Sequence, residues 1–449
     1  MEPWLDDLAD EFQSLSFTST VTNTTAAEIR PSTSSSSEAT FTVASSSAYG
    51  SFSSIATRSH RLLRPQLSLS DLRFLQRLGS GDIGSVYLAE LKCSPAPTSD
   101  DSAIPPLAAK VMDKRELASR SKEGRAKTET EILAMLDHPF LPSLYACVDS
   151  PKWLCLLTEF CPGGDLHVLR QRQPFKRFAE SAVRFYASEV VVALEYLHMM
   201  GIIYRDLKPE NVLVRSDGHI MLTDFDLSLK CESDTSTPQL VANHNPPTAT
   251  PKADRLIDAP VFASSSCILP SCIVPAVSCF RPKRRWRKKR PHSSDGPEFV
   301  AEPVDVRSMS FVGTHEYLAP EIVSGEGHGS SVDWWTLGIF MFELFYGVTP
   351  FRGLDHEMTL ANIVARALDF PKDPVVPVHA KDLISQLLAK DPARRLGSTT
   401  GASAIRRHPF FQGVNWALLR CTNPPYTPPP FSKDDVSEDS CPDTPVEYY

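Results

Sequence analysis

Residues 204–214, YRDLKPENVLV, bring together at short spacing the side chains that phosphoryl transfer requires. Asp206 can accept the proton of an attacking hydroxyl, and Lys208 places a cation near the transferred phosphate. Asn211 and the later Asp224 offer amide and carboxylate oxygen, which are ligands that Mg²⁺ prefers. The spacing therefore predicts a phosphotransferase with Asp206, Lys208 and Asn211 as catalytic residues and with Asn211 and Asp224 as metal ligands.

A glycine-rich turn is the candidate cradle for the phosphates. The segment GSGDIGSV (79–86) fits the pattern GxGxxGxV, in which glycines let backbone amides approach phosphate oxygens. A strand follows it rather than a helix, which disfavours a dinucleotide-binding unit. The nucleotide-binding residues expected from this turn are Leu78, Gly79, Gly81, Gly84 and Val86.

Lys110 lies on the next expected strand, where its amine can reach back under the glycine-rich turn. A carboxylate on the helix that follows could hold this amine in an ion pair. The bare pattern is satisfied by Glu129 or by Glu131, so the partner stays open at this level.

The elements that position these groups divide into a strand-rich part and a helical part. Strand-like alternation covers 72–81, 84–91 and 107–114. Helical spacing covers 124–137, 180–200 and 331–347. The last two stretches are apolar around too much of their circumference to lie on a surface. We therefore predict an α+β fold with a small β-rich N-terminal lobe and a larger α-helical C-terminal lobe.

The composition sets the boundaries of the folded part. Residues 1–71 are rich in Ser and Thr, and residues 230–305 carry Pro, Ser, Thr and a basic run, so both are predicted to be disordered. Residues 72–411 are the predicted domain, interrupted by that insert, and residues 412–449 are a C-terminal tail. A loop is expected over 94–106.

Bulk properties exclude several classes of protein. The net charge of -8 argues against general attraction to nucleic acid or membrane, so such binding must come from a local cluster. The ten cysteines include no CxxC pair, which argues against secretion or a zinc site. The most apolar window, 266–280, is shorter than the ~20 residues that a spanning helix needs. No membrane crossing is expected.

Four motifs together resemble the AGC group of eukaryotic serine/threonine protein kinases: HPFLPSLY, YRDLKPEN, GTHEYLAPE and DPARRLG. The resemblance covers residues 74–411 and implies the bilobal protein kinase fold, with ATP and Mg²⁺ as cofactors. Tyr204 replaces the usual catalytic-loop histidine, a change that the AGC group shares. The Asp-Phe-Asp triplet at 224–226 and the long insert in the activation segment resemble plant AGC subgroup VIII, the PINOID and WAG kinases of auxin signalling in particular.

The resemblance also implies roles for individual residues. The expected nucleotide contacts are Lys110 with Glu129 for the α and β phosphates, the backbone of Glu159 and Cys161 for adenine, and Asp165 for the ribose, with Thr158 as gatekeeper. The expected structural contacts are Thr314 with Asp206 and Lys208, Glu321 with Arg395, and Asp333 with the catalytic-loop backbone.

Substrate recognition and regulation follow from the same resemblance. Glu210 and Glu343 match the positions where AGC kinases receive an arginine upstream of the target hydroxyl, and carboxylates bind guanidinium in a bidentate manner. Ser310, with Ser308 beside it, matches the activation-loop phosphosite, where a phosphate can draw in Arg205.

Asp226 stands where such enzymes usually have glycine. The resemblance implies that this position acts through its backbone, and aspartate tolerates a left-handed φ better than most residues with a Cβ. We therefore expect a left-handed Asp226 in an active enzyme whose Phe225 flips outward less readily.

The leading hypothesis is a serine/threonine kinase that acts on basic sites, and the resemblance implies PIN-type auxin efflux carriers as substrates. A catalytically weak scaffold and a nuclear regulator are the alternatives. A scaffold would be expected to lose Lys110, Asp206 or Asp224, and all three are present. AGC kinases often end in an FxxF motif that recruits an upstream kinase. Here Val446 and Tyr449 match it poorly, which puts such activation in doubt.

The insert contains an apolar segment followed by RPKRRWRKKR (281–290), with eight cationic residues in ten. We expect this run, including Arg284, Arg285, Lys288 and Lys289, to bind anionic membrane lipids. The expected location is the cytoplasmic face of the plasma membrane and the cytoplasm, with nuclear import as the alternative. No direct nucleic-acid binding is expected, because no recognisable module surrounds the run.

Overall fold

The computed structural model describes residues 67–92, 105–231, 239–241, 298–300 and 307–431. The chain divides into two compact units, 1–238 with 300–449, and 239–299. The strands β10 (Gln239–Val241) and β11 (Glu298–Val300) pair as a two-stranded sheet. The candidate catalytic residues all belong to the larger unit.

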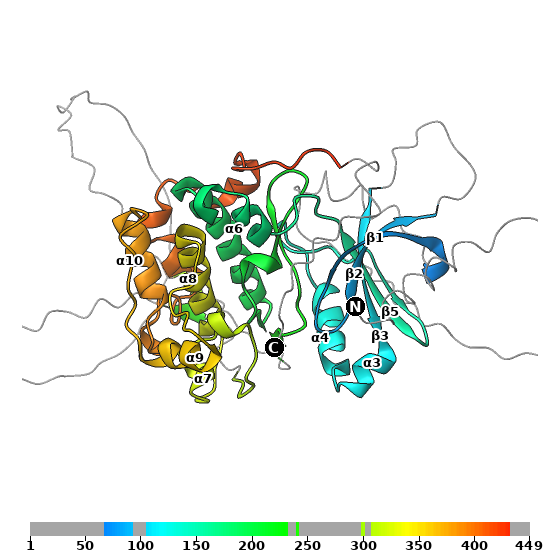
Figure 1. Cartoon of the computed structure of the whole chain (residues 1–449), viewed down its shortest axis with the longest axis horizontal. Coiled ribbons are helices and arrows are strands. Elements are labelled where there is room, and N and C mark those ends of the chain that lie inside the picture. Colours follow the sequence, from blue (N-terminus) through cyan, green and yellow to red (C-terminus); the bar gives the residue numbers. More distant parts are fainter. Residues whose placement is uncertain (1–66, 93–104, 232–238, 242–297, 301–306, 432–449) are drawn as a thin grey trace, which may run out of the picture. The chain divides into compact units, whose positions relative to one another are not determined.

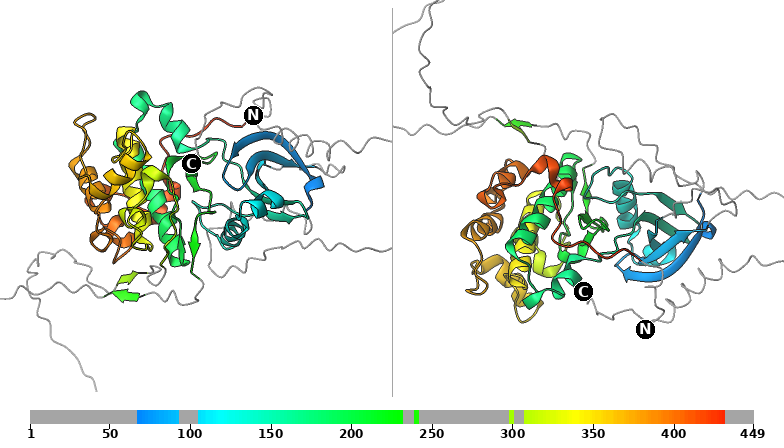
Figure 2. Two further views of the ribbon diagram at one scale, coloured as in Figure 1. Left: turned by 60° about the horizontal axis from the view of Figure 1, so that its bottom comes forward. Right: turned by 90° about the horizontal axis from the view of Figure 1, so that it is seen from above.

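The small lobe is built on one antiparallel sheet in the order β1-β2-β3-β5-β4 (Figure 1). Its strands are β1 (Leu72–Ser80), β2 (Ser85–Leu91), β3 (Leu107–Asp113), β4 (Ala146–Asp149) and β5 (Trp153–Glu159). Two helices accompany the sheet, α3 (Lys114–Ser119) and α4 (Glu123–Leu133). The two views in Figure 2 show the curved sheet with these helices beside it.

Alternation along β3 decides which side chains face the catalytic site. Ala109 and Val111 are buried in the core of the small lobe, together with residues of β2 and β5. Met112 belongs to the other core, which includes residues of α4. Because successive strand residues point to opposite faces, Lys110 shares the face of Met112 and is directed toward α4.

The large lobe is mainly helical. Its helices are α5 (Leu166–Gln171), α6 (Glu180–Met199), α7 (Pro320–Val323), α8 (Ser331–Tyr346), α9 (His356–Ala365), α10 (Val378–Leu387) and α11 (Ala402–Arg406). Its short strands are β6 (Ile202–Ile203), β7 (Val212–Val214), β8 (Ile220–Leu222) and β9 (Leu229–Lys230). The short 3₁₀ helices among the described residues are Leu69–Asp71, Pro174–Lys176, Pro209–Asn211, His315–Tyr317, Pro392–Arg394, Pro409–Phe411 and Trp416–Cys421. Most residues of α6 and nearly all of α8 are buried, as their apolar sequences predict.

The predicted bilobal fold is confirmed, with three corrections at the boundaries. Leu67, inside the N-terminal region predicted to be disordered, is buried in the small-lobe core. The insert predicted to be structureless begins with Lys230 in β9 and contains β10 and β11. The helix predicted over 124–137 ends at Leu133, shortly before the helix-breaking Pro139. Most of the two predicted disordered regions and of the loop lies outside the described residues.

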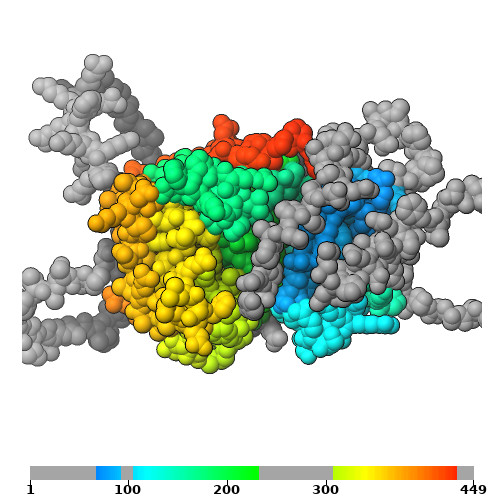
Figure 3. Space-filling view, viewed as in Figure 1, coloured from blue at the N-terminus to red at the C-terminus, as the bar shows by residue number. Residues whose placement is uncertain are grey.

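The first part of the predicted tail crosses the large lobe and reaches the segment between the lobes. Arg420 pairs with Asp217 at 2.7 Å, and the ring of Phe431 meets that of Phe160 at 5.2 Å. Figure 3 shows this segment in red along the upper edge of the molecule. Residues 432–449, with Val446 and Tyr449, lie outside the described part. Among the helices that are described, none is long and apolar enough to span a membrane.

Candidate active site

A chain of ion pairs joins β3, α4 and the Asp-Phe-Asp triplet. The amine of Lys110 lies 2.8 Å from Glu129 Oε1 and 2.9 Å from Asp224 Oδ1. Burial acts to lower the pKa of Lys110, but the two carboxylates outweigh it and the pKa is raised. This geometry identifies Glu129 as the partner. Glu131 instead lies 3.5 Å from Lys230, so the alternative that the sequence left open is excluded.

The candidate base, Asp206, sits in a buried network of four groups. Its Oδ2 accepts a hydrogen bond from Asn211 at 2.8 Å and lies 3.1 Å from the Lys208 amine. Its Oδ1 accepts one from the Thr314 hydroxyl at 3.1 Å, and Lys208 donates to the same hydroxyl at 3.0 Å. The bridge predicted for Thr314 is confirmed. Burial raises the pKa of Asp206, which favours its task as a proton acceptor.

A short hairpin brings the two predicted metal ligands together. Strands β7 and β8 pair from Val212 with Leu222 to Val214 with Ile220. Beyond the first pair, the backbone N–H of Thr223 donates to the carbonyl of Asn211 at 3.0 Å. Asn211 therefore lies directly beside the residue that precedes Asp224.

The carboxylate of Asp333, on α8, holds the backbone of the catalytic loop, as predicted. Its carboxylate accepts hydrogen bonds from the N–H of Tyr204 at 2.8 Å and of Arg205 at 2.7 Å. His198 lies 2.8 Å from the same carboxylate. Arg205 has a φ of 68°, so these bonds stabilise a left-handed residue next to the base.

The prediction that Asp226 adopts a left-handed φ is wrong. The positive φ in the triplet, 61°, belongs to Asp224. The Asp226 side chain is 4% exposed and forms an ion pair with Arg125 of α4, so this residue acts through its carboxylate. Phe225 is fully buried, and its ring meets that of Tyr204 at 5.3 Å.

The glycines of the phosphate loop serve two different purposes. A Cβ on Gly79 or Gly81 would contact nothing closer than 3.9 Å, so both leave backbone open to an approaching ligand. A Cβ on Gly84 would lie 2.5 Å from the carbonyl oxygen of Val111, so here only glycine lets β3 pack closely. The turn is closed by a hydrogen bond from Gly81 N–H to the Gly84 carbonyl at 2.8 Å. Leu78 is 42% exposed near the end of β1, and Val86 pairs with Lys110 across β2 and β3.

The predicted nucleotide contacts of the hinge lie at and after the end of β5. The Glu159 side chain binds Arg215 at 2.5 Å, so the predicted contact with adenine would be made by the backbone and not by this carboxylate. Cys161 is buried, and burial raises the pKa of its thiol. Asp165 caps the N-terminus of α5, where its carboxylate accepts a hydrogen bond from the Val168 N–H at 2.7 Å. Thr158 lies on β5 opposite Ala108.

The two carboxylates predicted to receive a substrate arginine have different surroundings. Glu210 lies 2.7 Å from His167 Nδ1, and this contact raises the pKa of His167. Glu343 is almost buried and binds Arg170 at 2.6 Å, while its other oxygen accepts a hydrogen bond from the Tyr317 hydroxyl. Glu210 is therefore the more accessible of the two receptors.

The predicted phosphosite serines lie against Arg205. Its Nη1 donates to Ser310 Oγ at 2.9 Å and to Ser308 Oγ at 3.3 Å. Ser308 also forms a backbone bridge with His328, through two hydrogen bonds of 2.9 Å. This cation lies beside the candidate base, as the sequence indicated.

The ion pair predicted between Glu321 and Arg395 is present and bidentate. The two nitrogen–oxygen distances are 2.7 and 2.9 Å, and both side chains are buried. Their role is structural, because the pair ties α7 to the segment after α10 and contacts none of the groups above.

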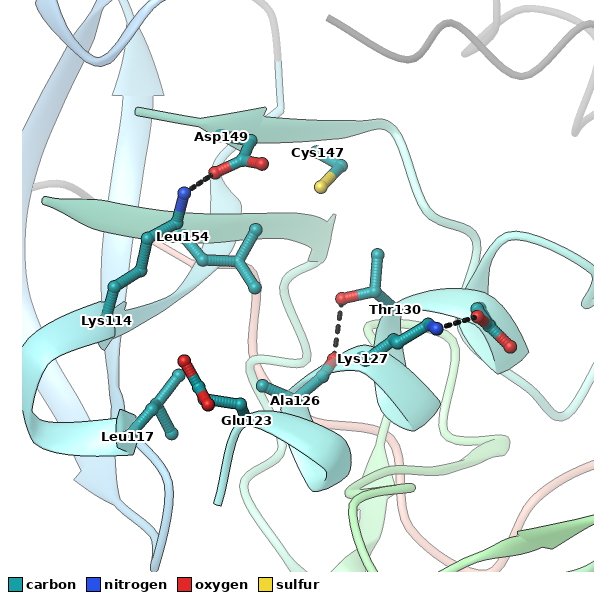
Figure 4. Close-up of a pocket in the computed structure, with 10 residues that line it drawn as sticks. Lys114, Leu117, Glu123, Ala126, Lys127, Thr130, Cys147, Asp149 and Leu154 are labelled. Atoms are coloured by element: carbon teal, nitrogen blue, oxygen red, sulfur yellow. Dashed lines mark hydrogen bonds and ion pairs between the residues drawn. The ribbon is translucent and has the colours of Figure 1, made fainter. Parts of the chain in front are cut away.

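A separate hollow of about 420 Å³ lies in the small lobe between α3, α4, β4 and β5 (Figure 4). Leu117, Ala126 and Leu154 give it apolar walls, and the ion pair of Lys114 with Asp149 lies beside them. The catalytic groups do not line it.

The donor set fits magnesium. One carboxylate and one side-chain amide, from Asp224 and Asn211, offer the hard oxygen ligands that Mg²⁺ takes when phosphate oxygens and water complete its shell. The Asp224 side chain is 30% exposed, which leaves it accessible from solvent.

Comparison with known proteins places this arrangement in a family. The protein kinase domain model matches residues 72–250 and 299–411. The chain belongs to the protein kinase family. It is 55% identical over 370 residues to the serine/threonine-protein kinase AGC1-5 of Arabidopsis thaliana, which covers 82% of this chain and 61% of that protein.

Two further relatives are also protein kinases. A protein kinase of Oryza sativa subsp. indica is 54% identical over 376 residues, covering 81% of this chain and 62% of that protein. The serine/threonine-protein kinase KIPK2 of Arabidopsis thaliana is 52% identical over 389 residues, covering 83% of this chain and 39% of that protein. The chain thus spans less than two thirds of the length of these relatives. The predicted resemblance to plant AGC serine/threonine kinases is confirmed, whereas the narrower likeness to PINOID and WAG kinases stays a prediction.

Proposed function

We propose that this protein is a serine/threonine protein kinase that transfers the γ-phosphate of ATP to hydroxyl groups in basic sequence contexts. The observation that carries the proposal is the continuous set of contacts from Glu129 through Lys110 to Asp224. It supports a catalytic arrangement that is already assembled, in contrast to a scaffold that has lost its chemistry.

We propose a task for each group. Lys110 would hold the α and β phosphates under the glycine-rich turn, while Asp206 accepts the proton of the substrate hydroxyl. Lys208 and Thr314 lie against Asp206 and would orient that hydroxyl toward the transferred group. Asp224 and Asn211 would hold Mg²⁺, which neutralises charge on the phosphate oxygens when it is bound.

An arginine upstream of the target residue would be received mainly by Glu210. Its carboxylate now faces His167, so a substrate guanidinium has to displace or share this contact. A protonated His167 would repel the arginine, and its pKa is raised, so acidic pH weakens recognition. The buried Glu343 is already bound on both oxygens and would support Glu210 through its charge.

The direct test is phosphorylation of synthetic peptides by the purified full chain with ATP and Mg²⁺, measured at neutral and at alkaline pH because deprotonation of His167 leaves Glu210 free to bind a substrate guanidinium. A serine peptide with arginine three residues upstream should be phosphorylated, and its counterpart with alanine there should be poorer. The Glu210→Gln variant should lose this preference while it retains turnover on the alanine peptide. Absence of transfer to any serine or threonine peptide would contradict the proposed function.

Phosphorylation of Ser310 or Ser308 is proposed to regulate the site. A phosphate adds about -1.5 to -2 charges next to the Arg205 guanidinium and would order the segment beside the base. We expect the Ser308→Ala, Ser310→Ala protein to have a kcat/KM about tenfold below that of the phosphorylated chain, or about 1.4 kcal/mol. Mass spectrometry of the two serines checks the modification. Equal activity before and after phosphatase treatment would contradict it.

The physiological substrates and location are proposed on the resemblance and the insert. PIN-type auxin efflux carriers would be the substrates, and the run at 281–290 would bind anionic lipid at the cytoplasmic face of the plasma membrane. Each basic residue near such a surface contributes at most about 1 kcal/mol, screened over about 8 Å. Binding would raise the effective concentration of the kinase near a membrane substrate. An upstream activating kinase, recruited by the C-terminal tail, would be a further partner.

The lipid proposal is tested with vesicles of phosphatidylcholine and phosphatidylserine. Four substitutions to glutamine, at Arg284, Arg285, Lys288 and Lys289, should abolish vesicle binding and peripheral location in cells. A control of equal charge changes four exposed cations of the folded domain to glutamine, Arg115, Lys127, Arg366 and Lys372. Equal loss in both proteins would indicate a net-charge effect, and retention by the first would contradict the anchor. If the first protein is lost from the nucleus, the basic run would act as a nuclear import signal, which is the alternative.

A further inference from the structure

Asp82, in the glycine-rich turn, is surrounded by three cations from the segment around the start of α4. Arg120 Nη2 donates to its Oδ1 at 2.7 Å, and Lys122 and Arg125 form ion pairs with the same carboxylate. Arg125 lies on α4, and the other two precede that helix. The turn over the phosphates is therefore tied by charge to the N-terminal end of α4.

Arg125 makes a second contact with the other nitrogen of its guanidinium. Nη1 binds Asp82, and Nη2 binds the carboxylate of Asp226 in the Asp-Phe-Asp triplet. The Arg125 side chain is 27% exposed and that of Asp226 is 4% exposed. A guanidinium suits this arrangement because its planar fork can serve two carboxylates at once.

Arg125 lies on the helix that also carries Glu129, the partner of Lys110. Glu129 follows four residues later and so lies on the same face of the helix. Two bridges thus run in parallel from α4: Glu129 to Lys110 and Asp224, and Arg125 to Asp82 and Asp226. Displacement of the helix would break both.

We infer that Arg125 is a positioning residue, which holds the phosphate loop, α4 and the Asp-Phe-Asp triplet in the one arrangement where Lys110 meets Glu129 and Asp224. A buried carboxylate that loses its partner is strongly unfavourable. Asp226 therefore keeps its buried place only while α4 is docked. A glycine at position 226 has no carboxylate and could not couple the triplet to the helix in this way.

The inference rests on the proposed function and deepens it, because it assigns the role of Asp226 to coupling and not to backbone freedom. It predicts that Arg125 and Asp226 act as one unit on nucleotide binding and turnover. Neither side chain is expected to affect the KM of the peptide, because Glu210, the proposed receptor of the peptide's arginine, lies outside the bridge.

The experiment is a double-mutant cycle in the full chain with Arg125→Met, Asp226→Asn and the double variant. The dissociation constant for Mg·ATP is measured with a fluorescent ATP analogue, together with kcat and the KM of ATP and of peptide. Each single variant should weaken Mg·ATP binding about tenfold and lower kcat with little change in peptide KM, and the double variant should be no weaker than the worse single. Arg125→Lys should recover only part of the loss. Its amine keeps the positive charge, but a point charge cannot span both carboxylates.

Lys127→Met is the matched control, because Lys127 is an exposed cation on the same helix. Hydrogen–deuterium exchange of the α4 peptides, faster in Arg125→Met and unchanged in Lys127→Met, reports the coupling independently of activity. Additive effects in the cycle, or equal effects of the Lys127 control, would overturn the bridge. A wild-type chain that transfers no phosphate would overturn the proposed function, while affinity and exchange would still decide on Arg125.

Discussion

Replacement of Asp206 with asparagine is expected to lower kcat by about 10³-fold while the thermal midpoint of unfolding barely changes. The carboxylate is the proposed acceptor of the substrate proton, and an amide cannot take that proton. The amide has nearly the same shape and can still accept from Thr314, which now donates to Oδ1 at 3.1 Å. The loss should therefore fall on chemistry, with the KM of ATP nearly unaltered.

The matched control for this change is Asp382→Asn, which neutralises an exposed carboxylate of α10 that contacts His408 and Gln386 and none of the catalytic groups. It should leave kcat unaltered. Turnover near the wild-type value in the Asp206→Asn protein would contradict the kinase mechanism, because Asp206 is the proposed proton acceptor and lies against both Lys208 and Thr314.

The periodicity of the sequence predicted the elements but not their neighbours. Alternation located β1, β2 and β3 to within one residue at each end. It could not show that β5 lies between β3 and β4, since that order depends on pairings between segments distant in the chain. The short strands near the catalytic loop were missed because two or three residues are too few to establish a period.

Motif spacing predicted the candidate residues Asp206, Lys208, Asn211 and Asp224, because these four lie close together in the chain and would serve fixed chemical tasks. The choice between Glu129 and Glu131 required the actual rotation of α4, which places one carboxylate toward β3. The role of Asp226 was missed for a related reason. Its partner is 101 residues away, and the one signal was an arginine four residues before Glu129.

Two substitutions of Lys110 should separate its catalytic role from its role in charge balance. The amine lies between two carboxylates at 2.8 and 2.9 Å, and the side chain is 14% exposed. In Lys110→Arg the charge remains, so Glu129 and Asp224 keep a cationic partner and the fold should persist. The larger planar guanidinium cannot take the same point between both carboxylates and the phosphates. We expect kcat/KM to fall by about 10²–10³-fold, a loss of about 2.7–4 kcal/mol.

Lys110→Met should add a loss of stability to the loss of activity. Removal of the cation leaves the buried Glu129 unpaired, and breaking a buried pair in this way costs about 3–5 kcal/mol. Chemical denaturation and steady-state kinetics of both variants provide the comparison, with Lys114→Arg as the matched substitution at a lysine that directly follows β3 and pairs with Asp149. If Lys110→Arg and Lys110→Met lose stability equally, a retained positive charge does not preserve the fold, and the size of the lysine side chain is what matters for stability. If Lys110→Arg retains full activity, the charge alone suffices and the assigned contact with the phosphates is wrong.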